Sequence, residues 1–391
     1  MISLLAFVVF APAHVIELIE PKATEISIQA LIKLPDLGAK DLAKLGIIAQ
    51  TIPKQTQAYP RREMLTVTAG VPVRCTIDPD IVRIVVSVPP DKLKSGLSLM
   101  ESLIQDATLT QENLDAAALE LAVPDYWSAA LNPIALPSVK LTSDEAQVLY
   151  KRVFRPERIQ LVVGGSFAKT EAISAWSVRM DHWTPAPESR GYFDITPTQE
   201  RTHNTSSVTT IDLVGAPIPS SDASLSARLL ALFALGTGKG ASLFRIVREK
   251  YAWSYRQEAI LSPTRDGWVP RLLIASIPTD VTADRVKTIK NDLMDDVKSW
   301  TEASRARALG MAEAVFKHDV PFSPLYVLGA SPVGNSLEAR TFMAGYWPLK
   351  TGTPWDPDAL LAAMKKTSLD DLKDQASAIL TSAIPRVLPG N

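Results

Sequence analysis

The sequence predicts an α+β fold of two homologous domains, each a largely antiparallel sheet packed with helices. Three observations carry this prediction. A chain of 391 residues is too long for one ordinary core and suggests two or three domains. Short β-like runs mix with amphipathic helices without strict alternation, which favours an antiparallel-rich sheet over a doubly wound parallel one. Finally, the two halves of the chain share one sequence pattern.

The shared pattern is a strand followed by a helix. Residues 84–104 align with residues 272–294 at an offset close to half the chain length. In each segment an apolar run ends in Ser, a branched aliphatic residue, Pro, any residue and Asp, at 87–91 and at 276–280. Apolar residues then recur at helical spacing: Leu93, Leu97, Met100, Leu103 and Ile104, and Val286, Ile289, Leu293 and Val297. This repetition predicts an ancient duplication.

The seam between the halves is predicted in residues 184–203, which are rich in Pro and polar residues and have no apolar periodicity. The predicted organisation is a signal peptide over 1–13, an N-terminal domain over 14–190, a linker over 191–204 and a C-terminal domain over 205–391. Strands are expected over 15–19, 26–32, 82–88, 207–214 and 269–277, and a helix over 224–235.

The N-terminus carries a short apolar run, Leu4 to Phe10, followed by Ala11, Pro12 and Ala13 at a spacing that a signal peptidase accepts. No Lys or Arg precedes the run, so a first buried strand is the alternative. The signal peptide predicts a periplasmic or secreted protein, with a cytoplasmic one as the alternative. No other apolar stretch reaches membrane-spanning length, so an integral membrane protein is not expected.

Composition and net charge bear on further classes of protein. The net charge is -1 and the pI is near 6.5, so nothing in the overall charge favours nucleic acid as a partner. The basic residues of 151–158 are interpreted as a solvated helix end. Cys75 is the single cysteine, and its apolar context predicts a buried small hydrophobe.

Three glycines, Gly236, Gly238 and Gly240, surround Lys239 and resemble a phosphate-binding loop. A Walker-type loop would place Gly at 233 and Ser or Thr after the lysine, where this chain has Phe233 and Gly240. Dinucleotide-binding glycines also require a different spacing and a preceding strand, whereas a helix is predicted before this segment. A phosphate loop is therefore excluded, and a glycine-rich break between two helices is expected.

The same segment resembles the pitrilysin/insulinase-type zinc metallopeptidases. Their pattern L-G-G-G-x-x-S-x-L-F-x-x-[IL]-R-E-K-x-G-L-A-Y-S is matched by Leu235–Gly238, Ser242–Phe244, Val247–Lys250 and Ala252–Tyr255. Residues 150–172 resemble a second family motif, with Ser166 where the family often has Asp. The resemblance covers nearly the whole chain. It implies two homologous domains of the metallopeptidase/LuxS type, four of which enclose a chamber.

Active members of this family bind zinc through H-x-x-E-H on a helix and a distal glutamate, and the Glu of the motif activates the zinc-bound water. No two of the four histidines here, His14, His182, His203 and His318, lie within a turn of each other. Alignment on Thr51 places Asp41, Lys44 and Leu45 at the motif positions. The distal ligand falls at Ala117, with Glu120 nearby. No cofactor is therefore expected in this chain.

Family members without the zinc motif often pair with a catalytic homologue and supply an Arg and a Tyr seven residues apart. Arg248 and Tyr255 match this spacing, and both side chains can donate hydrogen bonds to a developing oxyanion. The alternative is that Arg248 is a helix-end cation and Tyr255 a strand aromatic. Ala252 and Trp253 replace the family's Gly and Leu. The three glycines would form a chamber-wall loop, either as a simple helix–helix turn or as a surface near the substrate.

The resemblance thus implies the catalytically incomplete subunit of a heterodimeric zinc metallopeptidase. Its partner would be a homologous H-x-x-E-H subunit that carries the zinc, and its substrate a peptide. On its own the chain would not be a zinc peptidase. The alternative is a structural or assembly protein on the same fold, similar to the core subunits of respiratory bc complexes.

Overall fold

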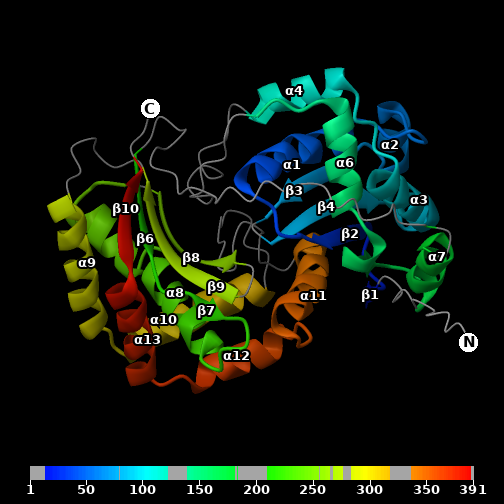
Figure 1. The fold of residues 1–391 in the computed structure, drawn as a ribbon. Helices are drawn as coiled ribbons and strands as arrows, with labels where there is room; N and C mark the ends of the chain where they lie inside the picture. Colours follow the sequence, from blue (N-terminus) through cyan, green and yellow to red (C-terminus); the bar gives the residue numbers. More distant parts are fainter. Residues whose placement is uncertain are drawn as a thin grey trace, which may run out of the picture. The chain divides into compact units, whose positions relative to one another are not determined.

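The computed structural model describes residues 14–78, 80–121, 139–180, 183, 209–254, 256–264, 267–275, 283–317 and 336–388. These residues belong to two compact units (Figure 1). The first unit comprises Met1–Ile77, Ile81–Ala118 and Ser138–Thr196, and the second comprises Asp78–Asp80, Leu119–Pro137 and Pro197–Asn391. The predicted signal peptide and linker lie outside the described residues, and the predicted domain boundaries remain predictions.

The first unit is built on a sheet in the order β1-β5-β2-β4-β3. All neighbours are antiparallel except β1 and β5, which are parallel. Alternate residues of the central strand β2 belong to the hydrophobic core, from Ile26 to Ile32, because successive side chains of a strand point to opposite faces. The strands are β1 His14–Ile19, β2 Ile26–Lys33, β3 Arg74–Ile77, β4 Ile81–Val88 and β5 Ile159–Gly165.

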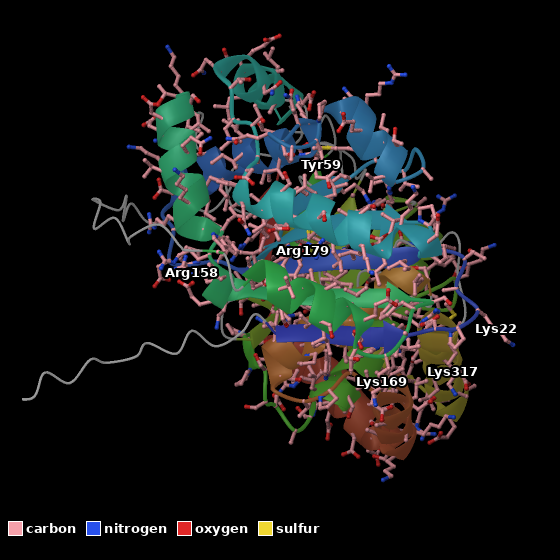
Figure 2. All side chains as sticks on the ribbon, turned by 90° about the vertical axis from the view of Figure 1, so that its right-hand side faces the viewer. Lys22, Tyr59, Arg158, Lys169, Arg179 and Lys317 are labelled. Carbon is pink, nitrogen blue, oxygen red and sulfur yellow. The ribbon has the colours of Figure 1, made fainter. Side chains whose placement is uncertain are left out.

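Helices cover the core face of this sheet. Contacts join α3 to β2 and β4, α7 to β1, and α1 to β3 and α6. Arg179 lies on α7 (Figure 2). It donates a hydrogen bond to Ser98 on α3 at 2.6 Å and forms an ion pair with Glu101 at 3.1 Å. The helices are α1 Ala39–Thr51, η1 Ile52–Lys54, α2 Arg61–Val67, η2 Pro90–Lys92, α3 Leu93–Gln105, α4 Gln111–Leu121, α6 Ser143–Val153, η3 Pro156–Arg158 and α7 Glu171–Met180.

The second unit has a sheet in the order β10-β6-β9-β7, and β8 pairs with β9. Every pairing among these described strands is antiparallel. The strands are β6 Thr210–Val214, β7 Ile218–Pro219, β8 Arg256–Thr264, β9 Gly267–Ala275 and β10 Ile384–Leu388.

The central helix of the second unit is α8, which contacts β8, α10, α12 and α13. Eight of its residues are buried, as expected for a helix that is apolar on nearly every side. The helices are α8 Leu225–Gly236, η4 Phe244–Lys250, α9 Ala283–Lys298, α10 Glu302–Lys317, α11 Leu337–Thr351, α12 Pro357–Lys366 and α13 Leu369–Ser382. No described helix is both long and apolar enough to cross a membrane.

The two sheets repeat one strand order. The strands β5-β2-β4-β3 of the first unit correspond to β10-β6-β9-β8 of the second, and every pair in both sets is antiparallel. In both units the third strand of this order leads to a helix, from β4 to α3 and from β9 to α9. This repetition supports the duplication, and the predicted α+β class with antiparallel-rich sheets packed with helices is confirmed.

One sequence interpretation holds only in part. Lys151 is exposed, as expected for a solvated helix end, but the side chains of Arg152 and Arg155 are only 14% and 13% exposed. Arg152 forms an ion pair with Asp41, which lies on a helix far away in the sequence, and Arg155 forms one with Glu157. Burial of these arginines is possible because each charge has a carboxylate partner.

Candidate functional site

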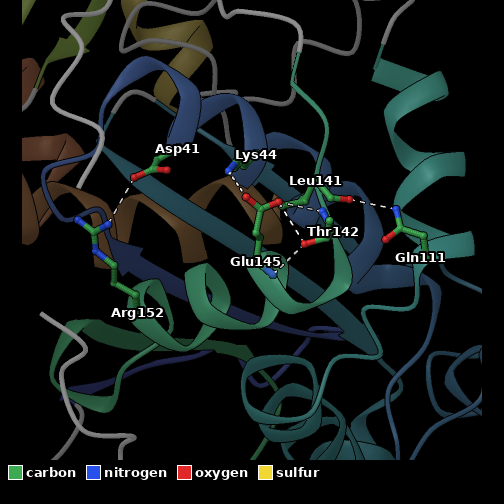
Figure 3. Close-up of polar contacts among 7 residues, drawn as sticks. All are labelled: Asp41, Lys44, Gln111, Leu141, Thr142, Glu145 and Arg152. Atoms are coloured by element: carbon green, nitrogen blue, oxygen red, sulfur yellow. Dashed lines mark hydrogen bonds and ion pairs between the residues drawn. The ribbon is translucent and has the colours of Figure 1, made fainter. Parts of the chain in front are cut away.

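The three residues at the zinc-motif positions lie on α1, and two of them are joined to α6 by ion pairs (Figure 3). The Nζ of Lys44 lies 2.9 Å from Oε1 of Glu145, and an Nη of Arg152 lies 3.4 Å from Oδ2 of Asp41. Leu45 is fully buried in the core of the first unit. The helix face that would carry metal ligands therefore holds two interhelical ion pairs and a core residue.

The start of α6 holds Glu145 in place for its ion pair. Thr142 caps the helix, accepting a hydrogen bond from the backbone N–H of Glu145, while the Glu145 carboxylate accepts one from the backbone N–H of Thr142. The hydrogen bond from Lys44 and the one from Thr142 lower the pKa of Glu145. Glu145 is thus a fixed, charged partner for Lys44, and its negative charge lies at the favourable N-terminal end of the helix.

These residues do not fit zinc. Zinc sites need several deprotonated N, O or S ligands with a free lone pair. Asp41 already binds Arg152, Lys44 is a cation, and Leu45 has no ligand atom. At the distal position, Ala117 is buried in the core and Glu120 is exposed. Among the described residues, no group of three or more His, Cys, Asp or Glu side chains could hold a metal ion.

The structure explains why each of the three positions in the predicted chamber-wall loop is a glycine. A Cβ on Gly236 would lie 2.9 Å from the Cα of Ala259 on β8, and closer still to its amide nitrogen. Gly238 has a φ of +80°, which other residues rarely adopt. A Cβ on Gly240 would lie 2.7 Å from the Cδ of Arg307. These contacts favour the interpretation of the segment as a tightly packed turn.

Side chains from α9 and α10 fix this turn. Arg307 donates hydrogen bonds at 2.9 Å to the carbonyls of Ala234 and Thr237, which lie at the C-terminal end of α8. A cation is favourable there because of the exposed carbonyls and the helix dipole. After the turn, the Ser242 hydroxyl donates to Asp296 at 2.5 Å and accepts from the Trp300 indole at 3.0 Å. The turn is rigidly packed and leaves little freedom to enclose a phosphate.

Arg248 lies on η4, a π-helical segment, and its side chain is half-buried. Single π-helical turns occur frequently at functional sites. The segment is held against α9 by Asp292, which accepts hydrogen bonds from Lys250 at 2.6 Å and from Tyr251. Burial raises the pKa of Asp292, but the hydrogen bonds from Lys250 and Tyr251 outweigh this effect and lower it overall. Tyr255 lies outside the described residues.

Ala252 stands where the family pattern has glycine, and its backbone lies in the left-handed region that favours glycine. Its φ is +53°, and its backbone N–H donates to the carbonyl of Arg248 at 3.2 Å. A non-glycine residue in this left-handed region is strained by about 1–2 kcal/mol. The departure from the family pattern therefore leaves the turn after η4 in place but strains it.

The face of each sheet opposite its helices carries a buried arginine that sequence reasoning missed. Arg83 on β4 donates through Nε to Oε1 of Gln29 on β2 at 3.1 Å. Arg271 on β9 donates through Nε to Oδ1 of Asp212 on β6 at 3.1 Å, and through Nη2 to Oδ2 at 2.7 Å. The two pairs have the same register. Gln29 is paired across the strands with Val85, two positions after Arg83. Asp212 is paired with Leu273, two positions after Arg271. Each unit therefore carries a buried arginine that is hydrogen-bonded to a side chain of the neighbouring strand.

Glu258 on β8 is the second feature that sequence reasoning missed. Its side chain is 5% exposed, and its Oε2 has no hydrogen-bond partner among the described residues. Burial raises the pKa of this carboxyl to about 8, an effect that Arg256 partly opposes. The sequence held one signal for this site. Glu258 directly precedes the apolar run 259–261, in a strand segment where buried residues are usually apolar.

Comparisons with known proteins identify the fold. No protein-family model matches the chain, and no curated protein sequence matches it. A solved structure described as a peptidase M16 inactive domain from Pseudomonas fluorescens is similar with a TM-score of 0.71 and 11% identity, over 97% of this chain and 96% of that one. A protease from Helicobacter pylori is similar with a TM-score of 0.71 and 13% identity, over 96% of both chains.

The periplasmic protease PqqL from Escherichia coli is also similar, with a TM-score of 0.64 and 12% identity. The match covers 96% of this chain and 44% of that one. At these identities the likeness concerns the fold. The chain has the fold of peptidase M16 domains, the pitrilysin/insulinase type, which confirms the fold expected from the resemblance of the sequence.

Proposed function

We propose that this chain is the non-catalytic subunit of a two-chain zinc peptidase. The proposal rests on a contrast between two helical segments of the chain, α1 and η4. On α1, ion pairs and a core residue occupy the zinc-motif positions. On η4, Arg248 keeps its place in the family motif and is half-buried. Supporting this, one similar structure is itself described as an inactive domain.

In this proposal Arg248 and Tyr255 act on a peptide whose hydrolysis depends on zinc in the partner. Zinc in the partner would activate the attacking water. The guanidinium of Arg248 and the phenol of Tyr255 would donate hydrogen bonds to the peptide backbone and to the oxyanion that develops on the attacked carbonyl. Such donors need no metal, and removing one oxyanion donor typically lowers kcat by about 100-fold or more.

The test is co-purification with a homologue encoded nearby that carries H-x-x-E-H, followed by a peptidase assay. Activity is expected only with both chains, and Arg248→Ala or Tyr255→Phe should abolish most of it. The matched control is Lys287→Ala, because Lys287 is an exposed cation of the same unit, on α9. Unchanged activity in the Arg248 and Tyr255 variants would instead support an assembly role. Zinc bound stoichiometrically by this chain alone, with chelator-sensitive activity, would overturn the proposal.

We also propose a periplasmic or secreted location, based on the N-terminal apolar run, which lies outside the described residues. One of the similar structures is described as periplasmic. Mass spectrometry of the mature protein tests the proposal, because cleavage after Ala13 would leave His14 as the first residue. Full-length protein in the cytoplasm would contradict it.

A further inference from the structure

Helix α9 carries three charged side chains along one face, those of Arg285, Asp292 and Asp296. Residues spaced by seven and by four positions recur on the same side of an α-helix. All three side chains contact the segment around Arg248, and α9 packs against η4. The segment that contains Arg248 is therefore attached to a single face of a neighbouring helix.

Two carboxylates make the attachments of η4 itself. Near its start, Oδ2 of Asp296 accepts a hydrogen bond from Nη2 of Arg245 at 2.6 Å. At its end, Oδ2 of Asp292 accepts one from Nζ of Lys250 at 2.6 Å and another from the hydroxyl of Tyr251. Hydrogen bonds between ionised partners are stronger than neutral ones. Both ends of η4 are thus held by carboxylates that lie one turn apart on α9.

These attachments favour a π-helical register over an α-helical one. Arg245 and Lys250 are five residues apart, and in an α-helix their side chains would point about 140° away from each other, because each residue turns by about 100°. In a π-helix the backbone hydrogen bond spans five residues, so residues five apart lie on one side. The N–H of Tyr251 donates such a bond to the carbonyl of Ile246 at 3.2 Å. The two carboxylates therefore select the register that the backbone has.

The register decides where Arg248 points. A π-helical turn is rare, and helical segments in proteins depend mainly on tertiary contacts for their stability. Relaxation of η4 to an α-helix would turn one end relative to the other by about 100°, the angle of one residue. Because Arg248 lies between the two attachments, the direction of its guanidinium depends on them.

The attachment to α9 continues beyond η4. The ring centroids of Tyr251 and Trp253 lie 4.9 Å apart. The guanidinium of Arg285 lies 5.7 Å from the centroid of the Trp253 ring, and Nζ of Lys250 lies 5.2 Å from that of Tyr251. Each ring thus has a cation over its face, which is a favourable arrangement. Trp253, which replaces the leucine of the family pattern, extends the contact with α9 to the residues just before Tyr255.

We propose that Asp292 is a positioning residue for Arg248, and that together with Asp296 it holds η4 in the π-helical register that aims the guanidinium. This role rests on the proposed function and adds to it the element that directs its hydrogen-bond donor. Neither aspartate touches the peptide or takes part in the chemical step. Loss of Asp292 releases the end of η4, so that Arg248 spends part of its time in directions that do not reach the oxyanion.

The first test uses the full chain alone and follows amide hydrogen exchange of residues 244–254 by mass spectrometry. Asp292→Ala should speed exchange in this segment about tenfold and leave exchange in the strands of both sheets unchanged. The side chain of Asp292 is 21% exposed, so the variant is expected to fold. Lys250→Ala combined with Tyr251→Phe removes the same contacts from the other side and should have the same effect.

The matched control for exchange is Asp295→Ala. The side chain of Asp295 is 72% exposed, and its ion pair is with Lys298 of the same helix. Exchange of residues 244–254 should therefore stay within about twofold of the wild type. Unchanged exchange of this segment in Asp292→Ala or in the Lys250 and Tyr251 double variant would contradict the hold of α9 on η4. Equal acceleration throughout the chain would contradict it as well.

The second test measures kcat and KM of the two-chain complex for Asp292→Ala, for Arg248→Ala and for the variant with both substitutions. Asp292→Ala should lower kcat about tenfold and leave KM within about twofold, because only the direction of the donor changes. In the Arg248→Ala background it should cause no further loss, because the effects of residues that act through one group do not add.

Two kinetic results would overturn the positioning role of Asp292. One is an unchanged kcat in Asp292→Ala, and the other is the full loss of kcat when the same substitution is made in Arg248→Ala. Unchanged activity in Arg248→Ala alone would instead remove the proposed peptidase function, and the positioning role with it. The exchange experiment would then still show separately whether α9 holds η4 in its register.

Discussion

Replacing Glu258 by glutamine should make the folded protein more stable at alkaline pH. The carboxyl group ionises near pH 4.5 in the unfolded chain, but burial raises its pKa to about 8 in the folded protein. Between these values the unfolded state loses this proton while the folded state keeps it. The free energy of unfolding therefore falls as pH rises, by about 1.4 kcal/mol per pH unit and by about 4–5 kcal/mol in total above pH 8.

The assay is urea unfolding of the wild type and of Glu258→Gln at pH 5 to 9, with the difference between the two curves taken at each pH. Other titrating groups contribute equally to both proteins and cancel. Because a buried glutamine amide keeps part of the desolvation penalty, we expect a gain of about 2–4 kcal/mol at pH 8.5 and a small difference at pH 5. Glu249→Gln is the control. Parallel curves for wild type and Glu258→Gln would show that the pKa of Glu258 is not raised in the folded protein.

Two further predictions concern the backbone around the Arg248 motif. Ala252→Gly should raise the free energy of unfolding by about 0.5–1 kcal/mol. It relieves the strain of the positive φ, and this gain exceeds the cost of a more flexible unfolded chain. A lower stability in urea unfolding would contradict this. Gly236→Ala should lower the free energy of unfolding by about 2–3 kcal/mol, because its Cβ would overlap the Ala259 backbone. An unchanged unfolding midpoint would show that this contact can relax.

Local patterns were sufficient to predict much of the fold. The apolar run in 82–88 and the helical spacing that follows correspond to β4 and α3. The helix predicted over 224–235 is α8, which ends one residue later. The break expected after this helix is the turn that contains Gly236 and Gly238. These features depend on neighbours within a few residues.

The features that the sequence did not predict depend on partners far along the chain. Arg152 was interpreted as solvated, yet its partner Asp41 is 111 residues away and meets it only because α1 packs on α6. Glu258 is buried because β8 pairs with β9 and its side chain falls on the face opposite α8. Neither the pairing register nor the burial is encoded in the residues next to Glu258, so its raised pKa could not be predicted.

The contribution of Arg248 to a partner's zinc peptidase activity is the central claim, and one kinetic comparison tests it most directly. The co-purified two-chain complex should be assayed as wild type, Arg248→Ala and Lys287→Ala, at equal zinc content and equal amounts of both chains. We predict that kcat/KM falls about 100-fold or more in Arg248→Ala and stays within about twofold in Lys287→Ala. Wild-type kcat/KM in Arg248→Ala would contradict it.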